Sequence, residues 1–327
     1  MPLPPNGVIV YDGPSTINGA PVVVVLTSLR GKSTNSKTAG EALPMAQTYV
    51  IPRAMLEGMV PGGRGTAAWF ANMAAGRDAA ACGSCELRPS IVAAIKSQGG
   101  AAPDACYVLN GPPDVAQGIV NGSYPVVSLD VAAGYVRDML AAGRIAGVRG
   151  GSWGDPAAAP FNVHATLHAA TRGVRVRHPD GRERRAVWTC YTRTWEYAPD
   201  VAATGWRRIA MASAHSPAEA LLALSRGWRP FTVIDGRNEA HLADATVLAL
   251  AHPGLHCPAS NERDTDASCS RCGACDGSRD ADPRGAVTIF SHGPSNRSAA
   301  ACSAAKAMLA RLDAVRATRA ASRRLSA

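Results

Sequence analysis

Four cysteines near the end of the chain have the spacing of metal ligands. Cys257, Cys269, Cys272 and Cys275 follow the pattern C-P-x10-C-x2-C-x2-C. Three thiolates from one tight loop can face a single centre and Cys257 can add a fourth, which suits a [4Fe–4S] cluster or tetrahedral zinc. Zinc sites more often use two separated C-x2-C pairs, and a Cys-Pro pair is typical of ferredoxin-type clusters, so the pattern favours iron–sulfur. Zinc and unmetallated thiols are the alternatives.

A second group of cysteines, Cys82, Cys85 and Cys106, follows the pattern C-x2-C-x20-C. Three thiolates leave one position of a four-ligand site open, so the group predicts a second iron–sulfur cluster with an open iron, or a zinc site. Cys190, His215 or a ligand from outside the chain are candidates for the fourth position. A single C-x2-C step is a weak signal, so reduced thiols without a metal are the alternative.

The composition of the chain indicates a reducing compartment. The nine cysteines are an odd number, and the first residues show no basic stretch followed by an apolar one. We therefore expect a cytoplasmic protein without a secretory signal, with metal ligation rather than disulfides. The longest apolar run near the start, Pro21–Leu26, is too short to span a membrane. The net charge of +9 allows a polyanion partner, although no dense basic run with interleaved aromatics occurs.

Short apolar runs alternate with helical stretches over most of the chain, which predicts an α/β fold with a parallel sheet. The favoured architecture is a TIM-like β/α barrel or incomplete barrel with a cysteine-rich metal-binding loop, and an open doubly wound sheet is the alternative. The expected strands are Val22–Val25, Thr48–Ile51, Cys106–Leu109, Ile145–Arg149, Val187–Tyr191, Ile209–Ser213, Phe231–Ile234 and Val287–Phe290.

Three regions are expected along the chain. Residues 1–40 form an N-terminal strand and loop extension, and residues 41–295 form the barrel-like domain. That domain includes an arginine hairpin insertion at residues 172–186 and a metal loop at residues 257–277. Residues 296–327 are rich in Ala and Arg and predict a C-terminal basic helix.

Polar and aromatic residues follow several expected strands, as at the mouth of a barrel. Asp155 in Gly-Asp-Pro is a candidate substrate-binding group or general base, although Asp before Pro also commonly forms turns. His215 is a candidate ligand or acid–base group, with a simple polar loop residue as the alternative. Trp153 and Trp195 are candidates for stacking on a planar cofactor or base, with packing at the barrel rim as the alternative.

Six arginines lie in a short segment that reads as a β-hairpin around the turn His178-Pro-Asp-Gly181. The hairpin, Arg172–Arg185, is the best candidate for contacting phosphates, and nucleic acid is therefore a possible partner. A solvated insertion is the alternative, because charged runs usually face water. The six are Arg172, Arg175, Arg177, Arg182, Arg184 and Arg185.

An ordered series of short motifs runs through about residues 30–295. The series is Asn35-Ser-Lys-Thr38, Cys82-Gly-Ser-Cys85-Glu-Leu-Arg88, Ala105-Cys106-Tyr107-Val108, Gly122-Ser-Tyr-Pro125, Gly151-Ser-Trp-Gly-Asp-Pro156, Tyr191-Thr-x2-Trp195, Met211-Ala-Ser213, Gly227-Trp228, Cys257-Pro-Ala-Ser260, Cys269-x2-Cys-x2-Cys275-x-Gly277 and Ser291-His-Gly293. In this order the chain resembles the bacteriophage "gene product 88" family of uncharacterised proteins. The resemblance implies a phage or prophage origin, and hence the cytoplasm of the host cell, but supplies no reaction.

A weaker analogy links the chain to radical S-adenosylmethionine enzymes, which combine a β/α barrel with a three-cysteine [4Fe–4S] site. Their C-x3-C-x2-C spacing is absent here, so the analogy concerns only the fold.

Two functional hypotheses follow. The first is an iron–sulfur enzyme, redox or radical in type, that acts on an unknown substrate at the polar mouth. The second is a non-catalytic metalloprotein in which iron–sulfur or zinc staples the loops while the arginine hairpin contacts host nucleic acid or a host protein.

Overall fold

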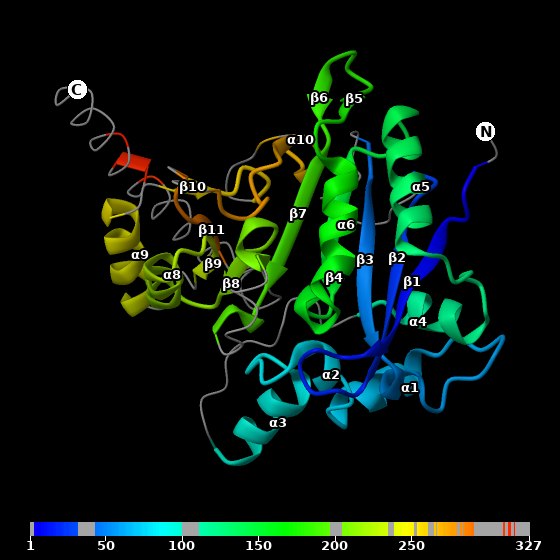
Figure 1. Cartoon of the computed structure of the whole chain (residues 1–327). Helices are drawn as coiled ribbons and strands as arrows, with labels where there is room; N and C mark the ends of the chain where they lie inside the picture. Colours follow the sequence, from blue (N-terminus) through cyan, green and yellow to red (C-terminus); the bar gives the residue numbers. More distant parts are fainter. Residues whose placement is uncertain are drawn as a thin grey trace.

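One large, mostly parallel β-sheet organises the protein (Figure 1). The structure is a computed structural model that describes residues 3–31, 43–99, 111–196, 205–234, 239–251, 254–260, 265, 267–279, 282, 284–290, 310, 313, 314 and 317. The expected strand Cys106–Leu109 and nearly all of the expected basic helix at 296–327 lie outside these residues.

Nine described strands form the sheet in the order β1-β2-β3-β4-β7-β8-β9-β11-β10. The pairs β1–β2 and β2–β3 are antiparallel, and all following pairs are parallel. The strands are β1 (Gly7–Pro14), β2 (Pro21–Thr27), β3 (Met45–Pro52), β4 (Gly147–Trp153), β7 (Val187–Thr192), β8 (Met211–Ala214), β9 (Pro230–Ile234), β10 (Leu255–His256) and β11 (Val287–Phe290).

The barrel expected from the sequence is not confirmed, because the described strands form an open sheet. The strand β1 lies at one edge and β10 at the other, and no pairing of described residues joins them. The α/β class and the parallel sheet are confirmed, and an open sheet was the alternative architecture. The segment expected as an N-terminal extension supplies β1 and β2, which belong to this same sheet.

The core forms because most strands are apolar on both faces. In β2 every residue from Val22 to Thr27 is buried, as expected for a strand covered on both sides. Val22, Val24 and Leu26 belong to the main hydrophobic core. Val23 and Val25 pack on the opposite side with Ile9 and α4 residues.

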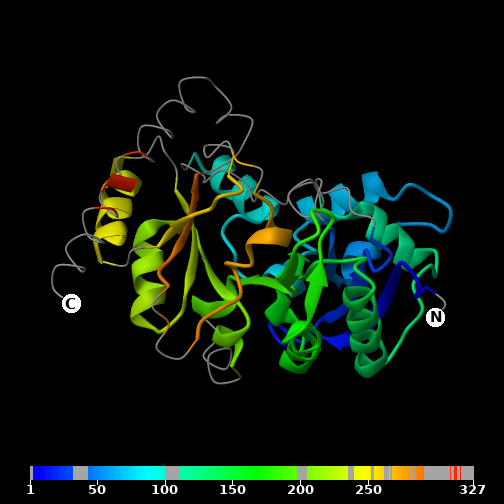
Figure 2. The ribbon, with the colours of Figure 1, turned by 90° about the horizontal axis from the view of Figure 1, so that it is seen from above.

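Helices cover the sheet and one of its ends. Figure 2 shows α8 and α9 beside the C-terminal strands, with α5 toward the opposite end of the sheet. In Figure 1, α1, α2 and α3 lie at the end toward which β3 and β7 run. The helices are α1 (Thr66–Ala74), α2 (Ala79–Cys82), α3 (Pro89–Ser97), α4 (Pro113–Val120), α5 (Leu129–Ala141), α6 (Phe161–Thr171), α8 (Pro217–Ser225), α9 (Glu239–Ala251) and α10 (Cys269–Cys272), with 3-10 turns η1 (Arg53–Leu56), η2 (Pro156–Ala158), η3 (Thr194–Glu196) and η4 (Trp206–Arg208).

Local signals in the sequence set two of these elements. The α8 helix begins with a capping box, in which the Ser216 side chain accepts a hydrogen bond from the Glu219 backbone N–H at 3.2 Å. The arginine hairpin forms as expected, from β5 (Arg175–Arg177) and β6 (Glu183–Arg185). It projects from the end of the molecule opposite α1–α3 (Figure 1). None of the described helices has the length and apolar character needed to cross a bilayer.

Candidate functional site

The carboxyl ends of three neighbouring parallel strands bring polar residues together. Asp155 follows β4, Arg193 follows β7 and His215 follows β8. The α2 helix closes this edge, since the Asp155 N–H donates to the Ala81 carbonyl oxygen at 2.7 Å. In open α/β sheets, ligands bind outside the carboxyl ends of the strands. We call Asp155, Arg193, His215, Glu86 and Glu219 the carboxyl-end site.

Asp155 holds the ends of β4 and β7 together. Its Oδ1 accepts hydrogen bonds from the Thr192 hydroxyl at 2.7 Å and the Ala157 N–H at 2.9 Å. Its Oδ2 accepts from the Arg193 N–H at 2.7 Å, the Thr194 N–H at 3.0 Å and the Thr194 hydroxyl at 2.9 Å. Burial raises the pKa of Asp155, and these hydrogen bonds lower it. Both oxygens are already used, so the immediate role of the carboxylate is to position the two loops.

Arg193 joins the acidic residues of the site. Its guanidinium forms a two-pronged ion pair with Glu219, with Nη2 donating to Oε1 at 3.2 Å. It also pairs with Glu196 at 2.9 Å and donates to the Ser213 carbonyl oxygen at 3.3 Å. Only 13% of the arginine side chain is exposed. Arg193 therefore fixes α8 against the ends of β7 and β8.

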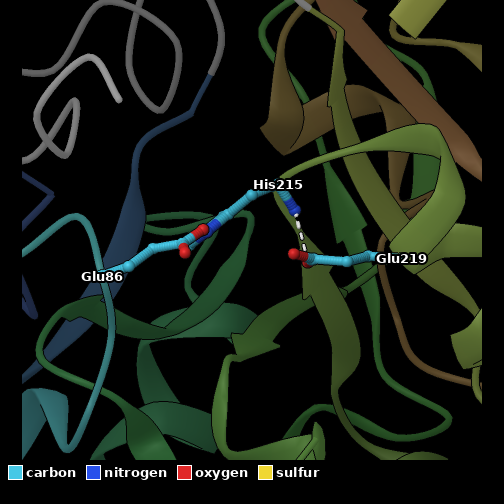
Figure 3. Close-up of side chains that lie close together, drawn as sticks. All are labelled: Glu86, His215 and Glu219. Atoms are coloured by element: carbon cyan, nitrogen blue, oxygen red, sulfur yellow. Dashed lines mark hydrogen bonds and ion pairs between the residues drawn. The ribbon is translucent and has the colours of Figure 1, made fainter. Parts of the chain in front are cut away.

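Glu86, His215 and Glu219 form a compact group (Figure 3). One ligand atom from each lies within 4.8 Å of the other two, and no other such group of three occurs among the described residues. His215 Nδ1 lies 3.1 Å from Glu86 Oε1, and the His215 backbone N–H donates to Glu219 Oε2 at 2.9 Å. Burial and then the charge of Arg193 lower the pKa of His215, while both glutamates raise it. Its ring is therefore neutral near pH 7, as a metal ligand must be.

The Cys82–Cys85 turn lies beside this site. Cys82 ends α2, and the Cys85 N–H donates to the Cys82 carbonyl oxygen at 3.2 Å. Burial raises the pKa of the Cys85 thiol, and the charge of Arg193 lowers it. The charge of Asp155 also raises the pKa of this thiol, so the residues that follow β4 and β7 both lie close to Cys85. Cys106, the third member of this predicted group, lies outside the described residues.

Trp153 and Trp195 are both packed into the protein. Trp153 is 5% exposed, and its ring centroid lies 4.9 Å from that of Trp69. Trp195 is 4% exposed, and its Nε1 donates to the Ser213 carbonyl oxygen at 3.1 Å. The Arg226 guanidinium lies 5.8 Å from the Trp195 ring centroid. This geometry matches the packing alternative, and stacking on a planar cofactor stays a prediction.

The C-terminal cysteines lie against the first half of β7. The strand β8 pairs with β7 only at Tyr191 and Thr192, which leaves the edge before them open to another segment. The thiol loop, residues 269–277, takes this place, and the Cys190 N–H donates to the Cys275 carbonyl oxygen at 3.3 Å. Gly277 has φ +81°, and a Cβ there would lie 2.7 Å from the Arg208 backbone. Glycine therefore permits the close approach that seats this loop.

Three of the four predicted ligands lie near one another. Burial, together with the charges of Cys269 and Cys257, raises the pKa of the Cys275 thiol to about 12. The Tyr191 hydroxyl and the Arg229 guanidinium both lie close enough to the Cys275 sulfur to lower this pKa. Cys272 is exposed. Within the described residues the sulfur atoms do not gather within 4.8 Å of one another, so no closed cysteine metal site is shown.

Glu86, Glu219 and Arg193 were not expected as site residues. Arg193 directly follows β7, and Glu219 completes the capping-box pattern Ser216-Pro-Ala-Glu219, so both have a local signal in the sequence. Glu86 had none, because its partner His215 lies 129 residues further along the chain. Two other polar segments follow expected strands, at residues 235–237 and 291–293, and both lie outside the described residues.

Searches with protein-family models, against curated proteins and against solved structures found no match to this chain.

Proposed function

We propose that the chain is an iron–sulfur protein in which Cys257, Cys269, Cys272 and Cys275 bind a [4Fe–4S] cluster. The carboxyl-end site would bind the substrate of a redox or radical-type reaction. The observation that carries the proposal is that Cys257 and Cys269 both lie close enough to Cys275, beside β7, to raise the pKa of its thiol. These cysteines are up to 18 residues apart in the sequence, yet they lie together at the part of the β7 edge that β8 does not pair with. Such convergence of distant thiols is what a shared metal ligand set requires.

The chemistry of this place fits a metal better than a simple thiol cluster. Neighbouring thiolates repel one another in a poorly solvated place, and a positively charged centre removes that cost. The Arg229 guanidinium, 4% exposed, and the Tyr191 hydroxyl both stabilise negative charge on Cys275. Hydrogen bonds to a ligating sulfur are typical surroundings of a bound metal. Cys272 is exposed and would have to turn inward to complete the set.

The strand β7 links the two sites. Tyr191 contacts Cys275, and the next residue, Thr192, donates to Asp155. Since successive side chains of a strand point to opposite faces, the thiol loop and the Asp155 carboxylate lie on opposite sides at one level of β7. A redox centre on the loop would thus be separated from the carboxyl-end site by β7 alone. The resemblance to the phage family supports a phage-encoded protein that acts in the host cytoplasm.

The test is the metal and sulfide content of protein purified without oxygen. About four irons and four sulfides per chain, with visible absorbance, are expected for one cluster, and about eight of each for a second at Cys82, Cys85 and Cys106. The double variant Cys269→Ser/Cys272→Ser should lose the first cluster, whereas Cys302→Ser, outside both groups, should keep it. Stoichiometric zinc in a colourless protein would overturn the redox proposal and leave a zinc-stapled protein.

A second candidate function is nucleic-acid binding through the arginine hairpin. Arg184 pairs with Asp180 at 2.7 Å and Arg175 with Glu183 at 3.6 Å. The other four arginines are exposed and have no acidic partner within salt-bridge distance among the described residues: Arg172 at the base of the hairpin, and Arg177, Arg182 and Arg185 within it. The projecting hairpin therefore carries an excess of accessible positive charge, which suits phosphates.

The hairpin candidate is tested with a labelled oligonucleotide at two salt concentrations. The triple variant R177S/R182S/R185S should weaken binding and lower the salt slope by about one unit for each phosphate that an arginine no longer neutralises. The triple variant R64S/R137S/R207S removes the same charge from exposed positions outside the hairpin and is the matched control. An equal decrease in both variants would mean that net charge, and not the hairpin, causes the binding.

A further inference from the structure

The carboxyl-end site holds more negative than positive charge. Glu196 and Glu219 share the single guanidinium of Arg193. Glu86 has only His215 as a partner within salt-bridge distance in the described part of the chain. The carboxylates of Glu86, Glu196 and Glu219 therefore face the one guanidinium of Arg193, so negative charge exceeds positive charge in this half-buried place. Such an excess favours a divalent cation.

The three side chains of the compact group converge from separate elements. Glu86 lies in the turn after α2, His215 directly follows β8, and Glu219 lies in the first turn of α8. Their ligand atoms lie within 4.8 Å of one another, slightly wider than the spacing around a bound ion with ligand distances of about 2.0–2.2 Å. Glu86 is 51% exposed and has only His215 as a partner within salt-bridge distance among the described residues. Glu219 is held by Arg193, but its Oε1 accepts only one hydrogen bond from the described part of the chain and keeps a lone pair for an ion.

The imidazole is oriented rather than mobile. The backbone N–H of His215 donates to Glu219 Oε2, and the ring Nδ1 lies 3.1 Å from Glu86 Oε1. The charged or titratable groups that act on His215 are Arg193, Glu86 and Glu219. One imidazole and two carboxylates are a ligand set that suits divalent transition metals such as Mn²⁺, Fe²⁺ and Zn²⁺.

We propose that Glu86, His215 and Glu219 bind a divalent transition-metal ion at the carboxyl ends of β7 and β8. This site is separate from the thiol loop and does not depend on an iron–sulfur cluster there. Three protein ligands leave coordination positions open, as in catalytic metal sites. An oxygen-bearing group of the substrate, such as a carboxylate or phosphate, would take one of these positions.

The competing explanation is a plain latch, in which His215 and Glu86 only tie the turn after α2 to β8. A latch would affect stability but would not bind a cation. The two explanations therefore differ in a direct binding measurement.

The test uses the full chain, stripped with a chelator, and Mn²⁺ as the probe, because soft thiolates bind Mn²⁺ poorly. The electron paramagnetic resonance signal of free Mn²⁺ falls as the ion binds, which gives stoichiometry and affinity. We expect about one Mn²⁺ per chain, and a loss of affinity of at least tenfold in both E86Q and H215A. Glu86 is exposed, so E86Q tests the site even where H215A does not fold.

Two controls separate this site from other effects. E57Q removes an exposed carboxylate that pairs with Arg77 elsewhere and should bind Mn²⁺ as the wild type does. The variant C269S/C272S should keep Mn²⁺ binding while it loses any metal held by the thiol loop, so failure of either proposal is seen independently. Wild-type protein that binds no Mn²⁺, or E86Q and H215A with unchanged affinity, would overturn the proposal and leave the latch.

Discussion

The hydroxyl of Tyr191 lies beside the sulfur of Cys275 and lowers the pKa of that thiol, so the thiol loop lies against β7. The same strand residue packs its ring against Phe231 of β9, with ring centroids 4.8 Å apart. The tyrosine is thus held from two sides, and its hydroxyl is fixed at the predicted metal ligand. A fixed donor stabilises negative charge on a sulfur and so favours metal binding there.

Replacement of Tyr191 by Phe should therefore weaken metal binding while the fold is kept. Removal of such a supporting hydrogen bond typically lowers metal affinity by about 10–100-fold. Competition with a chelator measures the affinity. Y49F is the matched control, because the Tyr49 hydroxyl contacts Gln47 in β3, away from the cysteines. A metal affinity of Y191F within twofold of that of the control would show that the Tyr191 hydroxyl does not support metal binding.

Asp155 gives the second prediction, because one carboxylate accepts five hydrogen bonds from the ends of β4 and β7. In D155N an amide NH₂ replaces one oxygen and faces donors that lose their acceptor. The free energy of unfolding should fall by about 3–5 kcal/mol, as for other broken buried charge networks. Urea unfolding measures the change.

The controls for Asp155 remove single donors. T192V and T194V each remove one hydroxyl and should lower the free energy of unfolding by only about 1–2 kcal/mol. If D155N cost less than T192V, the carboxylate would not be the element that joins the two loops.

Local sequence patterns predicted most of the strands, because a run of β-branched or apolar residues is a short-range signal. The β-branched run Val22–Val25 lies inside β2, and Val187–Tyr191 lies inside β7. The capping box of Ser216 and Glu219 set the start of α8 for the same reason. The arginine hairpin was recognisable from its turn residues alone.

Sheet closure could not be read in this way. Strand–helix alternation is the same in a barrel and an open sheet, and only long-range pairing separates them. Here β1–β2–β3 form an antiparallel edge, and β10, with two residues, ends the other side. The convergence of Glu86 with His215 is also a tertiary event, for which no local pattern existed.

The site was predicted best where strand ends carried it. Asp155 and His215 were each expected directly after a strand, and the structure places them after β4 and β8, on either side of β7 at the same edge of the sheet. Their partners Arg193 and Glu219 lie close in sequence to these strand ends. The ion pair between Arg193 and Glu219, however, depends on the tertiary fold and has no local sequence signal.

His164 gives a pH-dependent prediction. It is fully buried, and burial lowers its pKa to about 3 from 6.5. The Thr48 hydroxyl accepts from the Gly151 N–H at 2.8 Å and is hydrogen-bonded to His164 Nε2 at 3.2 Å. Between about pH 6.5 and pH 3 the unfolded chain binds a proton that the folded protein does not. Stability from this residue is therefore complete above pH 6.5 and falls as the pH decreases.

The expected loss from His164 is about 2 kcal/mol of unfolding free energy between pH 7 and pH 5. The variant H164Q carries no titrating group and should lose about that much less over the same interval. Urea unfolding at the two pH values gives both numbers, and contributions from other groups cancel in the comparison. Equal losses in the two proteins would mean that His164 takes up a proton in the folded state as easily as in the unfolded chain.

Gly147 tests how closely β4 and β7 approach each other. A Cβ at this position would lie 1.9 Å from the Val187 carbonyl oxygen, which is backbone and cannot rotate away. Gly147 and Val187 are paired residues of the parallel ladder, so the clash would separate the two strands that carry Asp155 and Arg193. G147A should therefore lower the free energy of unfolding by about 3 kcal/mol or more.

Gly134 in α5 is the matched control, because a Cβ there meets no atom within 4 Å. G134A should instead raise the free energy of unfolding by about 0.5–1 kcal/mol, since alanine loses less backbone entropy than glycine inside a helix. Thermal unfolding of both variants measures the difference in sign. A G147A protein as stable as the wild type would show that β4 and β7 are not paired in this register, and the arrangement of the carboxyl-end site would fall with that pairing.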